Sequence, residues 1–184
     1  MKKKPKALFS IKDIAILGVL LALYVVTGVF SIRIGSIFKI GFTFVAIACA
    51  GAIYGPVAGG TVGALGDVLA FLVNPTGAYF PGFTLTAFLS GVVFGVFLRK
   101  KAGVFRIIIA SFIVEVVGGL VLNTFWISII VNKGYTALVP GRAAQACGMF
   151  VVQVLTITLM NKFLFPILRK LTKEEEEPPL LREC

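Results

Sequence analysis

Polar side chains of three kinds interrupt the apolar stretches of this sequence and could together bind a small molecule. Carboxylate and amide groups can read an edge of hydrogen-bond donors and acceptors. Arginine and lysine attract carboxylates, and arginine can hold one through two parallel hydrogen bonds. Aromatic rings can stack on a flat ring. The sequence therefore predicts a site for a flat heteroaromatic group with an anionic tail, formed by Arg33, Lys39, Asp67, Tyr79, Phe80, Asn123, Trp126, Arg142 and Gln145.

Some of these side chains also admit a simpler interpretation. Tyrosine and tryptophan are enriched at membrane surfaces as anchors, so Tyr79 and Trp126 could serve that purpose alone. Asp67 lies inside an apolar stretch, where a carboxylate is costly unless it is paired or functional. Glu115 is the second such carboxylate, and a pairing with a basic residue such as Arg106 stays open beside a functional role.

The sequence carries none of the familiar catalytic or nucleotide-binding patterns. It has no histidine, which removes the commonest general base and metal ligand. Its three cysteines lie far apart and form no CxxC pair, so a zinc site has no support. The patterns GxxxxGK[ST], HExxH and GxSxG are absent. We therefore expect a binding or permeation unit without enzymatic activity, cofactor, metal or power source of its own.

Composition indicates the elements that must position these residues. Hydrophobic residues make up 58% of the 184 and charged residues 14%, against about 45–50% and about 25% in soluble domains. Mean hydropathy is +1.00. Because a backbone in lipid must satisfy its own hydrogen bonds, we expect an all-α membrane protein, a bundle of six transmembrane helices. The apolar runs that predict them are 7–30, 40–54, 57–73, 82–98, 104–131 and 141–168.

The net charge of +10 is placed so as to set orientation rather than to bind nucleic acid. Basic residues gather at the ends of the apolar runs, and cytoplasmic loops are the ones that carry such an excess. With the N-terminus in the cytoplasm, every basic residue falls on the cytoplasmic side except Arg33, Lys39, Lys133 and Arg142. We therefore expect both termini in the cytoplasm. Residues 1–170 would form the transmembrane substrate-binding domain, and residues 171–184 an acidic, disordered tail.

Small residues on the first apolar run suggest a surface for another helix. Ala15, Gly18 and Ala22 are spaced three and four apart, which places them on one face of a helix. Such faces let helix backbones approach closely within membranes. Packing inside the bundle would use the same pattern, as would the glycines within 59–66, so the spacing alone does not separate the two uses.

Three stretches of the chain resemble one family of membrane proteins. Gly63–Asp67, Tyr79–Gly91 and Leu122–Trp126 resemble the substrate-binding S-components of energy-coupling factor (ECF) vitamin transporters, and the folate-specific group most closely. The basic N-terminus, the six apolar runs and the small residues of the first run agree with that family along most of the chain. The stretch beginning Tyr-Phe-Pro-Gly-Phe-Thr-Leu is the more specific part, because small-residue spacing is common in membrane helices.

The resemblance implies a bacterial, multi-pass protein of the cell membrane that binds a vitamin from outside with high affinity. It also implies partners, namely one transmembrane coupling protein and two ATPases, on which the S-component docks before it topples and releases its substrate inward. The family's small first-helix residues contact the coupling protein, and Ala15, Gly18 and Ala22 would do so here. The family's usual alanine pair is represented by Gly18 and Ala22.

Folate as the substrate would suit the polar residues. Asp67 or Asn123 would read the edge of its pterin, and Lys39 and Arg142 would hold its glutamate carboxylates. An S-component for thiamine or riboflavin would share the same elements. A self-sufficient channel or small permease would also have such helices but would transport without partners. An intramembrane enzyme would need a nucleophile, base or metal set that the sequence lacks.

Overall fold

The computed structural model describes residues 10–34, 38–75, 79–99, 103–132 and 134–173. Residues Val104–Val131 form one continuous helix, whose middle part, Val114–Leu122, is π-helical. The N-terminal lysines and the glutamate run of the tail lie outside the described residues. In chain order the elements are α1 (Ile11–Val29), β1 (Ile32–Ile34), β2 (Phe38–Ile40), α2 (Thr43–Tyr54), α3 (Pro56–Val73), α4 (Pro81–Leu98), α5 (Val104–Ile113), η1 (Val114–Leu122), α6 (Asn123–Val131) and α7 (Tyr135–Lys173).

Most of the helices are long and apolar enough to cross a membrane. Five qualify within the described residues, namely α1, α3, α4, the segment Val104–Val131 and the part Tyr135–Ile167 of α7. The remaining helix, α2, has only 12 residues. Large apolar side chains such as Val19 and Leu155 are exposed on the outside of the bundle, as expected of a surface that meets lipid. The prediction of a helical, multi-pass membrane protein is confirmed.

Two elements differ from the helix-only prediction. β1 and β2 form an antiparallel hairpin in which Arg33 pairs with Lys39. The alternation of apolar residues with these cations has the period of a strand, but it is too short to stand out between two long apolar runs. The last helix begins at Tyr135 rather than at Gly141. Pro140 therefore lies within α7. Proline has no N–H group and so leaves one backbone carbonyl without its helical donor, but membrane helices tolerate this because neighbouring groups can satisfy the carbonyl.

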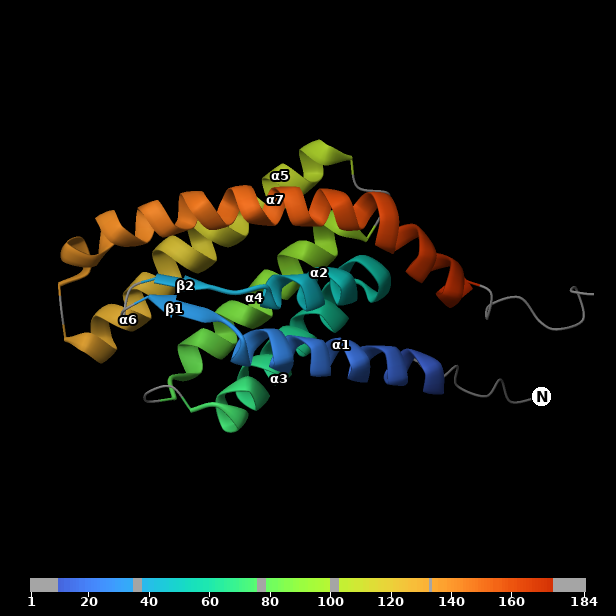
Figure 1. Cartoon of the computed structure of the whole chain (residues 1–184), viewed down its shortest axis with the longest axis horizontal. Coiled ribbons are helices and arrows are strands. Elements are labelled where there is room, and N and C mark those ends of the chain that lie inside the picture. Colours follow the sequence, from blue (N-terminus) through green and yellow to red (C-terminus); the bar gives the residue numbers. More distant parts are fainter. Residues whose placement is uncertain (1–9, 35–37, 76–78, 100–102, 133, 174–184) are drawn as a thin grey trace, which may run out of the picture.

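The bundle has two distinct ends. In Figure 1 the start of α1 and the end of α7 lie at one end. The β1–β2 hairpin, the end of α3, the start of α4 and the end of α6 lie at the other, which we call the hairpin end. Loops that are far apart in the sequence are thereby brought together at the hairpin end.

Glycines hold the centre of the bundle together. The interface between α3 and α4 is the largest between any two elements. A Cβ atom on Gly91 would lie 2.1 Å from the carbonyl oxygen of Gly59, so the two backbones touch where only hydrogen stands on each Cα. The short α2 is enclosed by α1, α3, α4 and α7, and its alanines Ala46, Ala48 and Ala50 are fully buried. This closely packed centre supports the residues nearest the hairpin end.

Candidate functional site

A cavity of about 520 Å³ lies in the half of the bundle nearest the hairpin end. The C-terminal parts of α1 and α3, the N-terminal parts of α2, α4 and α7, and the segment from Val114 to Val131 contribute to its wall. This volume is within the usual range for small-molecule sites, about 300–1,000 Å³. A few polar groups converge on a wall that is largely apolar and aromatic, with Phe44, Ile47, Phe71, Phe80, Phe83 and Phe94 among its members.

Asp67 lines the cavity from α3 and is held by a chain of hydroxyl groups. Thr84 Oγ1, on α4, donates a hydrogen bond to Asp67 Oδ2 over 2.7 Å. Because the Thr84 proton is committed to the carboxylate, the Tyr79 hydroxyl is the donor in its 2.8 Å contact with Thr84 Oγ1. The Tyr79 ring also packs on Phe71, with 5.1 Å between centroids. The loop before α4 is thereby tied to the carboxylate.

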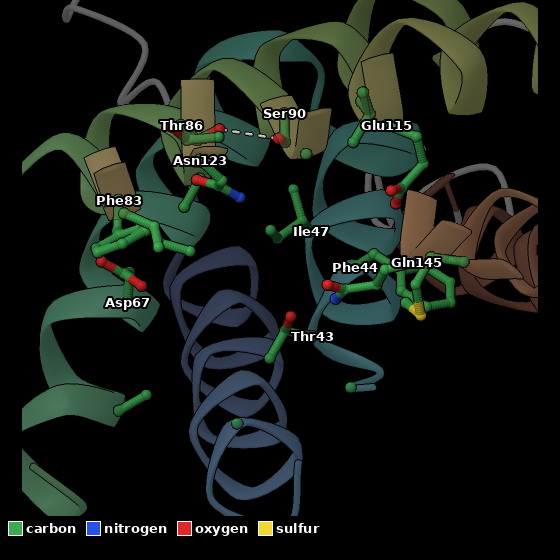
Figure 2. Close-up of a pocket in the computed structure, with 18 of the residues that line it drawn as sticks. Thr43, Phe44, Ile47, Asp67, Phe83, Thr86, Ser90, Glu115, Asn123 and Gln145 are labelled. Atoms are coloured by element: carbon green, nitrogen blue, oxygen red, sulfur yellow. Dashed lines mark hydrogen bonds between the residues drawn. The ribbon is translucent and has the colours of Figure 1, made fainter. Parts of the chain in front are cut away.

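Asn123 lines the cavity from the first residue of α6, and its side-chain oxygen has no partner. Its Oδ1 atom is buried without a hydrogen bond. Figure 2 shows the Asn123 amide near Thr86 and Ser90, whose hydroxyls both donate to backbone carbonyls of α4. A buried acceptor without a donor is costly, and a ligand N–H group would remove that cost.

A second polar cluster lines the cavity from α7 and η1. Arg142, which is 8% exposed, donates from its Nη1 atom to Gln145 Oε1 over 3.1 Å. Its guanidinium also interacts electrostatically with Glu115. Gln153 Nε2 donates a hydrogen bond to Glu115 Oε1. The cluster therefore combines a buried cation with a carboxyl group and two amides.

The two polar groups face each other across the cavity. Figure 2 shows Asp67 and Phe83 on one side, Glu115 and Gln145 on the other, and Ile47 between them. A ligand that satisfied both sides would need polar groups at both ends and an apolar or aromatic middle. That is the kind of ligand that the sequence predicts.

The π-helical segment η1 brings Glu115 and Asn123 onto the same wall. Glu115, Gly119, Asn123, Ile127 and Val131 all line the cavity although they are spaced by four. In an α-helix every fourth residue drifts by about 40° around the axis, so such a line would turn away from the cavity. A π-helix, with hydrogen bonds from i to i+5, turns less per residue and drifts in the opposite sense. Because the two drifts partly cancel, residues spaced by four stay on the cavity side of this helix.

Trp126 lies behind the wall rather than in it. Its Nε1 atom donates to Thr86 Oγ1 over 3.2 Å, and Thr86 lines the cavity. Its ring covers the Cα of Gly82, where a Cβ atom would lie 2.5 Å from the indole, and packs on Phe80 with 5.3 Å between centroids. Trp126 is not among the residues that line the cavity here, and its stacking on a ligand stays a prediction. The indole supports two residues that do line the cavity.

The other predicted residues divide into three groups. Asp67, Tyr79, Phe80, Asn123, Arg142 and Gln145 line the cavity. The side chains of Arg33 and Lys39 lie outside the described part of the structure, which places only their backbone in the hairpin. The predicted partner residues Ala15, Gly18 and Ala22 are exposed on α1, and a Cβ atom on Gly18 would meet nothing within 4 Å.

Sequence reasoning missed part of the wall. Glu115 contacts Gln153 rather than Arg106, the partner that the sequence suggested. Gln153 is 3% exposed and was not a candidate. A signal for it exists, because Arg142, Gln145, Met149 and Gln153 recur every three or four residues and so share one face of α7. Glu115 stands out in the sequence as a carboxylate inside an apolar stretch, but its place on this wall depends on the π-helical winding, which an α-helical period does not predict.

Comparison with known proteins identifies relatives over most of the chain. The family model described as ECF-type riboflavin transporter, S component, matches residues 8–170. The folate transporter FolT of Clostridium novyi (strain NT) is 41% identical over 122 residues, which cover 66% of this chain and 71% of that protein. The folate transporter FolT of Leuconostoc mesenteroides subsp. mesenteroides is 27% identical over 152 residues, or 78% of this chain and 80% of that protein.

A solved structure agrees with the same assignment. The crystal structure of FolT bound with folic acid matches with a TM-score of 0.79 at 34% identity, covering 85% of this chain and 98% of that one. The family model spans every residue that lines the cavity. This is a family of transporter subunits and not of enzymes. The chain belongs to the family of S components of ECF-type transporters.

Proposed function

We propose that this chain binds folate from outside the cell and delivers it inward as the S component of an ECF-type transporter. The observation that carries the proposal is a cavity with polar groups on two opposite sides and a wall that is otherwise largely apolar and aromatic. Folate has this shape, with a donor and acceptor heterocycle at one end and carboxylates at the other. Two relatives named as folate transporters and a similar structure bound with folic acid favour folate over riboflavin, the vitamin in the family description.

The cavity suggests how folate would lie. The pterin would lie on the side of Asp67 and Asn123. Its N–H groups would donate hydrogen bonds to the Asp67 carboxylate and to Asn123 Oδ1, which has no donor in the empty cavity. Tyr79 and Phe80 would border the rings. The glutamate carboxylates would reach Arg142 and Gln145, with Lys39 of the hairpin as a further cation. An arginine that is already desolvated binds a carboxylate strongly.

The membrane topology follows from the same reasoning. The chain would cross the membrane six times, with the short α2 as the second span and both termini in the cytoplasm of a bacterial cell. The start of α1 and the end of α7 lie at the same end of the bundle, which supports an even number of crossings. The hairpin end and its cavity would then face outward. Residues 1–170 form the substrate-binding domain in this proposal, and 171–184 a cytoplasmic tail.

Partners would supply the energy for transport. The sequence contains no ATP-binding P-loop, so the S component would depend on a transmembrane coupling protein and two ATPases. The exposed small face of α1 at Ala15, Gly18 and Ala22 is the proposed contact with the coupling protein. A helix of the partner could approach this face closely because no side chain projects from Gly18.

Isothermal titration of the detergent-purified chain with folic acid tests the proposal, with thiamine and riboflavin as controls. We expect tight one-to-one binding of folic acid and none of the controls. Binding of riboflavin or thiamine instead would keep the family and overturn the ligand. Folate transport by the chain alone in liposomes would contradict the need for partners.

A further inference from the structure

Among the described residues of the cavity wall, Glu115 is the one charged residue that the proposed ligand does not explain. The charged side chains among the described lining residues are Asp67, Glu115 and Arg142. Asp67 lies where donor groups of a pterin would bind. Glu115 instead lies on the side of Arg142 and Gln145, where the carboxylates of the tail are expected (Figure 2). An ionised carboxylate there would repel such a tail.

The surroundings of Arg142 suggest a role for Glu115 in the empty cavity. Arg142 is 8% exposed, and a buried guanidinium without a compensating charge is strongly destabilising. Glu115 lies on the same side of the cavity and attracts the guanidinium electrostatically, and Gln145 accepts a hydrogen bond from Nη1. Glu115 in turn receives a hydrogen bond from Gln153, a 3% exposed residue of α7 two to three turns beyond Gln145. Gln153 thus gives Glu115 a second partner that does not involve Arg142.

We propose that Glu115 is an exchangeable counter-ion that competes with the carboxylate tail of the ligand for Arg142. This inference rests on the proposed function, because it takes Arg142 as the group that holds the tail. In the empty cavity Glu115 neutralises Arg142. When the ligand enters, its carboxylate takes over the guanidinium, and Glu115 stays on Gln153. Glu115 and the tail carboxylate compete for the same cation. The free energy of attraction between Glu115 and Arg142 is lost when the tail binds, which lowers the affinity for the tail.

The competition gives Glu115 a role in release as well as in selectivity. A ligand without an anionic tail cannot displace Glu115 from Arg142 and gains nothing from that side of the cavity. When the carboxylate begins to leave, Glu115 can return to Arg142, so the buried cation is never left uncompensated. The same exchange keeps the bound state from becoming too stable for delivery.

The test compares two ligands that differ only in the tail. Folic acid and its diamide, in which both glutamate carboxylates are replaced by amides, are titrated calorimetrically into the wild-type chain and into Glu115→Gln. We expect Glu115→Gln to bind folic acid about 5- to 10-fold more tightly than the wild type, toward the low end of typical coupling between two ligands of one group. Binding of the diamide should change less than twofold. Asp13→Asn, which removes a carboxylate far from the cavity, should change neither.

A second variant should change the affinity for folic acid in the opposite direction. Gln153→Met has similar length but no donor, so Glu115 depends on Arg142 alone, and we expect folic acid to bind about 3- to 5-fold more weakly. Thermal unfolding without ligand would reveal whether Glu115→Gln folds. If it does not fold, Gln153→Met still tests whether Glu115 competes with the ligand for Arg142. Weaker or unchanged folate binding by Glu115→Gln, or equal tightening for both ligands, would overturn the exchange. Failure of the wild type to bind folic acid is a different result and overturns the proposed function itself.

Discussion

Thr84 on α4 donates a 2.7 Å hydrogen bond to Asp67 on α3, and this bond links the two helices at the cavity wall. It fixes one oxygen of a carboxylate that lines the cavity. Tyr79 in turn donates to Thr84, so the loop before α4 depends on the same bond.

Replacing Thr84 with valine tests this link. Valine has nearly the same shape but cannot donate, so Asp67 would lose its orientation. We expect folate affinity to fall about 3- to 10-fold, in keeping with the loss of one hydrogen bond to a charged group. Thr84→Ser keeps the hydroxyl and should bind nearly as the wild type does. Equal affinity of Thr84→Val and Thr84→Ser in titration calorimetry would refute the link.

Asn123→Leu should separate binding from stability. The Oδ1 atom is buried without a partner, so an apolar residue of similar size removes a desolvation cost from the empty protein. We expect the melting temperature of the ligand-free chain to stay equal or rise, while folate affinity falls about 10-fold through the lost acceptor. A parallel fall of both quantities would mean that Asn123 serves the fold and not the ligand.

Trp126→Phe tests whether the indole acts through its neighbours. Phenylalanine keeps a ring over Gly82 but lacks the N–H group that donates to Thr86. Because Trp126 does not line the cavity, we expect a loss of folate affinity of only about 2- to 5-fold, as for one neutral hydrogen bond at a supporting position. Trp126 is also the chain's single tryptophan, so folate binding to the wild type should alter tryptophan emission through Phe80 and Thr86. A loss of 100-fold would instead indicate direct stacking on the ligand.

Gly91→Ala should destabilise the bundle. The added methyl group would meet the carbonyl oxygen of Gly59 at 2.1 Å, and the backbones of α3 and α4 would have to separate. Overpacking of this kind costs about 1–3 kcal/mol or more. Gly18→Ala is the matched control, because a Cβ atom there meets nothing within 4 Å. Thermal unfolding in detergent measures both, and similar melting temperatures for the two variants would contradict the close approach.

Gly18→Leu should uncouple transport from binding. The side chain would project from the exposed face of α1 without touching the cavity, so folate titration should be unchanged within about twofold. Uptake in proteoliposomes that also contain the coupling protein and ATPases should fall strongly, because a large residue prevents close helix contact. Val19→Leu, at another exposed position of the same helix, is the control. Full uptake by Gly18→Leu would move the partner contact elsewhere.

The sequence alone determined the helices and most of the candidate ligand-binding residues. A bilayer requires long apolar runs, so the runs mark the helices, and polar residues inside them such as Asp67 and Asn123 stand out as costly. The spacing of Ala15, Gly18 and Ala22 likewise predicts a face of small residues on α1. These inferences depend on local composition and period, which a single chain displays directly.

Only the tertiary structure decided which polar groups share the cavity. Trp126 was expected in the wall, but its indole turns behind Phe80 and Thr86 because Gly82 leaves a space for it. For Glu115 the sequence left open a pairing with Arg106 or a functional role, and the structure places it on the π-helical segment η1, hydrogen-bonded to Gln153. The hydrogen bonds of Trp126 and Glu115 join residues that are 40 and 38 positions apart, and the place of Glu115 also depends on a local change of helical period. Neither is visible in the spacing of residues along one helix.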